Sequence, residues 1–148
     1  MQTRIFLHFF LRDLDKLVAE IEAFPNEESL WLIGGDVKNA AGTLGLHLAG
    51  NLQHFFGAIL GGTGYERQRD LEFSARNVPK QEIVTGLQTA RQVVEQVLEN
   101  MTDAQLNDVF PSAHFGENRS TLHALLHLLS HLSYHLGQVN YLRRLVAA

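Results

Sequence analysis

The chain has 148 residues, which fits one domain with an ordinary hydrophobic core, so we expect a single domain over residues 1–148. Its composition, 45% hydrophobic and 19% charged, contains no long apolar run and is typical of a cytoplasmic, globular protein rather than a membrane protein. The formal net charge is −4, and the scattered Lys and Arg residues argue against a nucleic-acid partner. The first residues lack a small-residue cleavage site, so no signal peptide is expected.

The chain contains no cysteine. This absence excludes disulfide bonds, zinc sites built from thiolates and a cysteine nucleophile. A tight transition-metal site in this chain must therefore use histidine nitrogens and carboxylate oxygens.

Helical periodicity predicts an all-α fold, a four-helix bundle. Apolar residues recur at three- and four-residue spacing over residues 3–24, 40–60 and 80–100, and from residue 120 toward the C-terminus. We expect Asn39 to cap the second helix and Ser120 or Thr121 to cap the fourth. The letters "TDAQ" (102–105) resemble a capping box that opens a short extra turn.

A long connection, residues 61–79, separates the second and third helices. Connections of this length are either functional segments or plain crossovers, and the sequence leaves both open. Glu66, Asp70 and Glu72 can supply a general base, and Arg67 and Arg69 can hold an anionic substrate group. For both groups, a solvated surface position is the favoured interpretation.

The fourth helix carries a histidine at every fourth position in "HALLHLLSHLSYHLGQV" (123–139). Each helical residue turns about 100°, so steps of four drift by about 40° and the four rings spread over about 120°. His131 and His135 then lie beside the apolar face, whereas His123 and His127 rotate away toward supporting, interface or surface positions. An i, i+4 pair of imidazoles can chelate one ion.

A third ligand must come from a facing helix, and the second helix offers "GLHLAGNLQHF" (45–55). His47 flanks the apolar face of this helix, and His54 follows seven residues later, nearly in line. Asn51 lies one turn from His47 and can orient a ligand or hydrogen-bond a substrate.

An ordinary hydrogen-bonded role is the alternative for every histidine. We favour it for four of them, His8, His54, His114 and His123. From spacing alone, the metal and ordinary interpretations of His131 and His135 stay balanced.

Two segments, "HLLSHLSYHLGQVNYLRRL" (127–145) and "LGLHLAGNLQHFFGAILGGTGYERQRDLEF" (44–73), resemble the DinB/YfiT-like superfamily of metal-dependent four-helix-bundle proteins. The similarity extends from Trp31 to Arg144. It implies that His47, His131 and His135 hold a divalent ion, nickel or zinc, with further positions open to water or substrate. Many members have arginine where this chain has Leu136, a departure that leaves the ligand positions intact.

The resemblance also implies a homodimer and, by analogy with thiol-dependent transferases and an isomerase in the superfamily, a low-molecular-weight thiol as co-substrate. The first functional hypothesis is thus a metal-dependent hydrolase or S-transferase acting on a small molecule, with no catalytic residue assigned. The pocket is expected between the second and fourth helices. Its candidate wall residues are Trp31, Asn51, Tyr65, His127 and Tyr134.

Core packing is the alternative for Trp31 and for the two tyrosines. The second functional hypothesis is a non-catalytic bundle that binds a metal or ligand for storage, sensing or a stress response. A structural ion should have four protein ligands, whereas a catalytic one keeps an open position. Because the sequence offers only three good ligands, it favours the open site.

Overall fold

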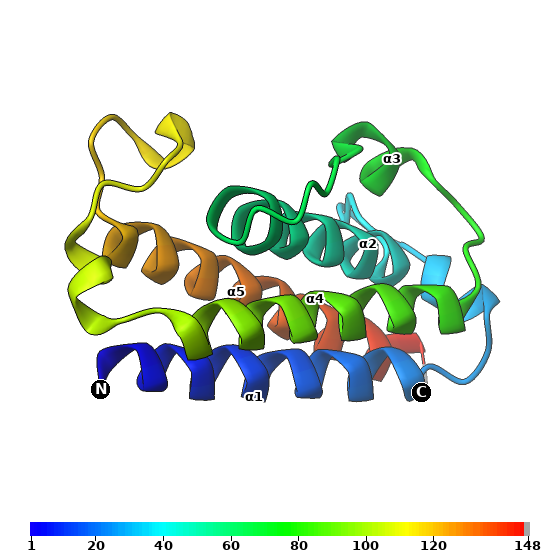
Figure 1. Cartoon of the computed structure of the whole chain (residues 1–148). Coiled ribbons are helices and arrows are strands. Elements are labelled where there is room, and N and C mark those ends of the chain that lie inside the picture. The colour runs from blue at the N-terminus through cyan, green and yellow to red at the C-terminus, as the bar shows by residue number, and fades with distance from the viewer. Residues whose placement is uncertain (147–148) are drawn as a thin grey trace.

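The structure is a computed structural model that describes residues 1–146, and it confirms the all-α prediction (Figure 1). Four long helices form the bundle, and a short helix, α3, lies in the connection between the second and third of them. Their bounds are α1 Gln2–Glu22, α2 Ala41–Leu52, α3 Arg69–Ser74, α4 Lys80–Asn100 and α5 Thr121–Val146. Within residues 1–146 there is no strand, and Val109 and Ser120 form an isolated bridge.

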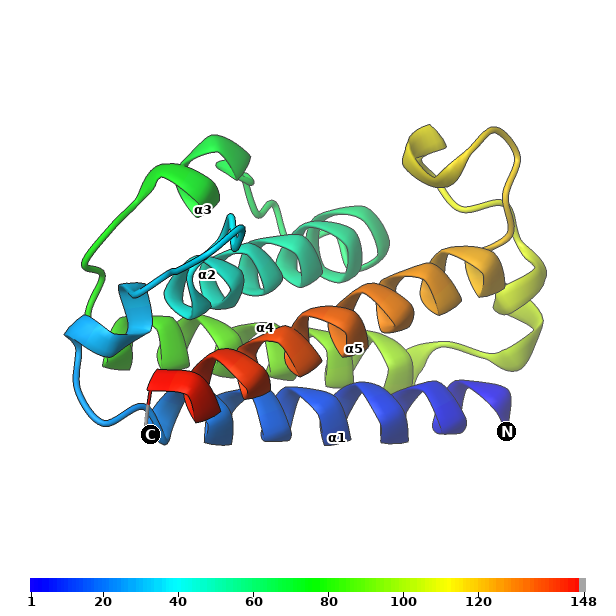
Figure 2. The same cartoon turned by 180° about the vertical axis from the view of Figure 1, so that it is seen from behind.

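In Figures 1 and 2, α4 and α5 lie between α1 and α2. α1 packs along both of them on one side, and α2 packs on both from the other side, with α3 lying over α2. Each long helix turns an apolar stripe inward, and burial of these stripes drives the packing. The fully buried side chains include Phe10, Leu14, Leu17, Leu48, Leu52, Leu87, Leu125 and Leu132.

The start of α2 differs from the prediction. Its N-cap is Ala40, which makes no side-chain capping bond, so the predicted Asn39 cap is wrong. Asn39 stands one residue too early for its side chain to cap the first turn. At this end of the helix, Trp31 packs directly on Gly42, where an added Cβ would lie 2.8 Å from the indole ring. The first turn of α2 therefore lies directly against the indole ring of Trp31.

The predicted second helix reaches Leu60, but its last part is a π-helix (Gln53–Leu60) rather than an α-helix. The π-helix packs against α4. Long π segments are rare and are enriched at functional sites. The other boundaries follow the sequence closely: α4 spans the predicted residues, Thr102 and Gln105 form the predicted capping box, and Ser120 Oγ accepts from the His123 amide at 3.1 Å.

A helix that spans a bilayer must be both long and apolar. Over residues 1–146, no helix meets both requirements.

Candidate metal centre

Three imidazoles from α2 and α5 converge in the bundle. His47 on α2 is buried, with 5% of its surface exposed, whereas His131 and His135 on α5 are half-buried. His131 Nε2 lies 3.0 Å from His47 Nε2 and 3.1 Å from His135 Nε2. The three residues predicted as ligands therefore form one cluster that can hold a metal ion.

The outer nitrogens of the two flanking rings fix their tautomers. His47 Nδ1 lies 3.0 Å from Glu72 Oε1, and His135 Nδ1 lies 2.6 Å from Gln138 Oε1. Both partners are oxygen acceptors, so each Nδ1 carries the proton and donates it. The Nε2 atoms of His47 and His135 consequently point lone pairs toward His131.

His131 stands between these two lone pairs. A ring nitrogen carries either one proton or one lone pair, so His131 Nε2 can satisfy at most one of its neighbours. Its Nδ1 is buried and has no hydrogen-bond partner among residues 1–146. Burial, together with the neighbouring His135 and His47, lowers the pKa of His131 to about 4, so the ring is neutral at neutral pH. A cation satisfies all three nitrogens at once, which hydrogen bonds cannot.

A buried ion pair between Glu72 and Arg67 lies on the Nδ1 side of His47 and supports this ring. Glu72 on α3 is only 7% exposed, and Arg67 donates to both of its oxygens, each at 2.9 Å. Burial acts to raise the pKa of Glu72, but the hydrogen bonds from His47 and Arg67 outweigh it and lower that pKa. Glu72 is therefore an ionised carboxylate that orients the imidazole, as carboxylates do behind metal-binding histidines.

The favoured surface interpretation of Glu72 and Arg67 was wrong, because α3 folds back over α2 and buries both side chains. Gly50 makes this approach possible: an added Cβ there would lie 2.0 Å from Glu72 Oε2. A helical glycine one turn from His47 was the sequence signal for the contact. Glu66 and Asp70 are exposed, as expected for solvated charges.

A small cavity of about 100 Å³ opens beside His47 and His131. Two predicted wall residues, Asn51 and His127, line it. The other lining residues are Arg67, Arg69, His114, Phe115 and Leu128. His114, for which we expected an ordinary hydrogen-bonded role, reaches the cavity because its short helix (Ala113–Phe115) packs on Phe55. The centroids of the His114 and Phe55 rings lie 4.9 Å apart.

The remaining predicted wall residues lie outside this cavity. Trp31 packs on Gly42 at the start of α2. Tyr65 lines a separate groove of about 400 Å³ on the other side of Glu72. Tyr134 is 66% exposed and meets the His135 ring edge-on, with centroids 5.4 Å apart. His54 does not join the cluster because seven residues advance about 10.5 Å along a helix.

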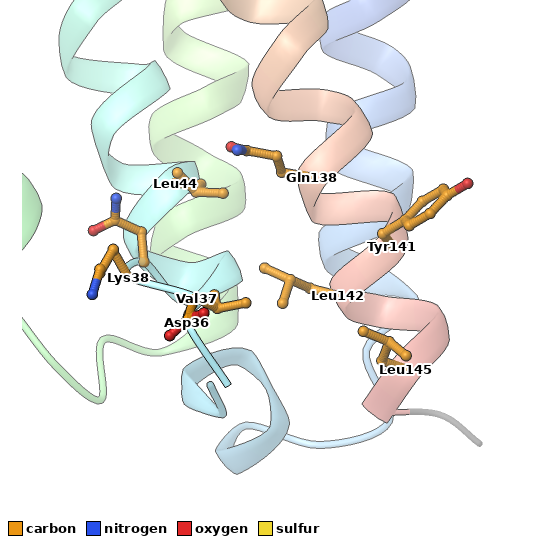
Figure 3. A pocket seen from close by; sticks show the side chains of 9 residues that line it. Asp36, Val37, Lys38, Leu44, Gln138, Tyr141, Leu142 and Leu145 are labelled. Atoms are coloured by element: carbon orange, nitrogen blue, oxygen red, sulfur yellow. The ribbon is translucent and has the colours of Figure 1, made fainter. Parts of the chain in front are cut away.

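A larger groove of about 510 Å³ lies between the start of α2 and the end of α5 (Figure 3). Its walls are mainly apolar, with Leu44, Tyr141, Leu142 and Leu145 among them. Figure 3 shows Gln138 reaching from α5 toward α2 at one end of the groove. Since Gln138 also accepts from His135, this residue connects the groove with the histidine cluster.

Comparison with known proteins gives a family and no described activity. The chain matches the DUF1572 family, described as a protein of unknown function, over residues 9–148. No curated protein and no solved structure matches the chain. The chain therefore belongs to the DUF1572 family.

Proposed function

We propose that this member of the DUF1572 family is a metal-dependent enzyme of the hydrolase or thiol S-transferase type. The observation that carries the proposal is the convergence of three imidazole nitrogens that hydrogen bonding alone leaves unsatisfied. His47, His131 and His135 would hold a divalent ion, nickel or zinc, both of which imidazole ligands suit.

The spacing of the nitrogens fits such an ion. Two imidazole nitrogens bound at about 2.1 Å to one ion lie about 3 Å apart when the two bonds meet at about 90°. The separations of 3.0 and 3.1 Å agree with this value. Three protein ligands leave further positions of the ion to a water or a thiol.

When bound, the ion would lower the pKa of a coordinated water or thiol, which makes it a nucleophile near neutral pH. The protein's own groups prepare the site for this chemistry. Glu72 holds the proton of His47 on Nδ1, so Nε2 is free to coordinate. The neutral state of His131 at neutral pH leaves its nitrogen free of a competing proton. Asn51 and His127 line the space in which the substrate would meet the nucleophile.

We further propose that DUF1572 belongs to the DinB/YfiT-like superfamily. Support comes from the order of the helices, from the placement of one ligand on α2 and two on α5, and from the Gly137–Gln138 pair after His135. The proposal carries the superfamily's features with it: a small-molecule substrate, a low-molecular-weight thiol, a homodimer and a cytoplasmic location.

A panel of small electrophiles tests the enzyme assignment, each incubated with metal-loaded protein and with several small thiols. We expect product formation that stops when a chelator removes the metal and returns when the metal is restored. The His131→Ala variant should be inactive, whereas His123→Ala, a substitution on an exposed part of the same helix, should retain the rate. A rate indifferent to metal and to His131 would contradict the proposal.

A non-catalytic metal-binding or sensing role is the second candidate. The observation that favours it is the engagement of Glu72, the buried acid beside the cluster, with both His47 and Arg67, which removes it as a general base. Stoichiometric metal binding without turnover across the panel would select this role.

A further inference from the structure

The small cavity beside the histidine cluster has an uneven distribution of charge. None of the described residues that line it carries a carboxylate, and two of them, Arg67 and Arg69, are arginines. The bidentate pair with Glu72 neutralises Arg67. Arg69 forms no ion pair within residues 1–146, so its guanidinium is the uncompensated positive charge of the wall.

Arg69 is exposed, as expected for a surface charge, and an aromatic contact holds its guanidinium near the proposed metal. Its guanidinium carbon lies 5.0 Å from the centroid of the Phe73 ring, a cation–π contact. The Phe73 ring in turn lies 4.7 Å from the His47 ring. Arg69 is thus stacked on an aromatic ring that touches a ligand of the cluster, and it faces a cavity that borders two ligands.

Asn51 supplies a second polar feature of the same wall. Only 7% of the residue is exposed, and its Oδ1 atom is buried without a hydrogen-bond partner among the described residues. Buried amides in native proteins almost always have partners, so an unpartnered amide oxygen in a cavity wall points to a ligand that supplies a hydrogen-bond donor. The residue follows His47 by one turn of α2, which places it on the same side of the helix.

His114 and His127 complete the polar wall. Burial, followed by the positive charges of Arg67, His127 and Arg69, lowers the pKa of His114. His114 is therefore neutral at neutral pH and can donate one hydrogen bond without adding charge. The uncompensated guanidinium of Arg69 leaves the wall positive, which fits an anionic head group.

We propose that this cavity binds the carboxylate of a small thiol whose sulfur reaches the metal, with Arg69 and His114 as the groups that recognise the carboxylate. Asn51 Oδ1, an acceptor, is left for a hydrogen-bond donor of the same ligand. The inference rests on the proposed function and names its substrate class, a thiol that carries a carboxylate. A cavity of about 100 Å³ has room for such a head group and for little more. Arg69 is placed here as a binding residue and not as a metal ligand.

The test uses the full-length protein loaded with Co²⁺, in which coordination of a thiolate to the metal produces a charge-transfer absorption band. Mercaptoacetate and 2-mercaptoethanol are titrated separately, because the two thiols have similar size and differ in the carboxylate. We expect mercaptoacetate to saturate the band at a concentration lower by about tenfold, the effect of a charge-assisted hydrogen bond. Acetate should displace mercaptoacetate more effectively than inorganic phosphate does.

The Arg69→Gln variant should lose most of this preference, and His114→Gln should lose part of it. Arg4→Gln, which removes an exposed arginine from the distant first turn of α1, should keep it. A preference that is unchanged in Arg69→Gln would come from chelation by the thiol itself and would overturn the inference. Stronger displacement by phosphate than by acetate would overturn the carboxylate assignment.

Cobalt content and circular dichroism of each sample distinguish failure of the carboxylate site from failure of the metal centre. One cobalt per chain with no role for Arg69 would overturn the carboxylate site and leave the metal centre standing. Absence of cobalt from the folded wild-type protein would overturn the metal centre, and the inference would fail with it.

Discussion

The two outer histidines of the cluster are supported in different ways. His47 donates to Glu72, a buried carboxylate on α3 that Arg67 clamps through two hydrogen bonds. His135 donates to Gln138, an exposed amide three residues later on the same helix. The first support is tertiary and charged, and the second is local and neutral. The comparison indicates that His47 depends on how the chain folds around it, whereas His135 depends on helix geometry alone.

Acidification acts on His131, the ring between the two supports, and on His135, whose pKa burial also lowers, so its effect should be the largest. The folded pKa of His131 is about 4, against 6.5 in an unfolded chain. The unfolded chain therefore binds the proton first as the pH falls. The stability that this ring contributes is complete above pH 6.5 and declines as the pH falls toward 4. The lowered pKa of Glu72 extends the decline below 4.5.

Thermal unfolding of the metal-free protein, measured at steps between pH 7.5 and pH 4, checks this expectation. The unfolding temperature should fall most steeply below pH 6.5, and the slope should be smaller in His131→Asn. A flat profile from pH 7 to pH 4.5 would contradict the buried, neutral state of the ring.

Removing the negative charge of Glu72, the hydrogen-bond partner of His47, should have the next largest effect, a loss of metal affinity. Glu72→Gln keeps the shape of the side chain but leaves Arg67 without its carboxylate and makes His47 a weaker ligand. Loss of such a support typically lowers metal affinity by about 10–100-fold. Titration against a competing chelator measures the change, and Glu66→Gln, an exposed acid of the same connection, is the matched control. Equal affinity in the two variants would contradict the role of Glu72.

Gly50→Ala should displace Glu72 by steric overlap while leaving its negative charge in place. The new Cβ would lie 2.0 Å from Glu72 Oε2, and Arg67 and His47 restrain that carboxylate from moving aside. We expect a loss of metal affinity of up to about tenfold, below that of Glu72→Gln. Gly86→Ala on α4 is the control, because its Cβ would meet only Ala49 at an ordinary 3.6 Å. This control should be neutral or stabilising, by about 0.5–1 kcal/mol.

Gln138→Leu tests the weaker support and should have the smallest effect. Gln138 is exposed, so water can accept the proton of His135 Nδ1 once the amide is gone. The expected loss of metal affinity is less than about tenfold, the lower limit for typical supporting residues. A loss that exceeds that of Glu72→Gln in the same chelator titration would reverse the comparison.

The difference between the supports of His47 and His135 also explains which parts of the site could be predicted from the sequence. The periodicity of α5 predicts that His131 and His135 turn inward, because that depends only on rotation along one helix. The same reasoning placed His47 on α2 and the four helices close to their observed bounds. The support of His47 could not be predicted, because α3 is short and Glu72 meets its partner 25 residues away in the chain. Charged residues in a connection are usually solvated, and the fold overrides that expectation here.

The same limit on prediction from the sequence applies to the cavity wall. His114 and Arg69 reach it from two separate connections, so no spacing along one helix relates them to the ligands. Asn51, by contrast, was predicted from its position one turn after His47. Residues on the helices that carry the ligands were accessible to sequence reasoning, and residues on the connections were not.

Elemental analysis of the purified protein and of two alanine variants is the decisive test of the three-histidine centre. We expect about one equivalent of nickel or zinc per chain in the wild-type protein and in His123→Ala, whose histidine lies exposed on the same helix. His131→Ala should lose this metal, because His131 is the ring that both flanking ligands approach. An unchanged metal content in folded His131→Ala would contradict the three-histidine centre.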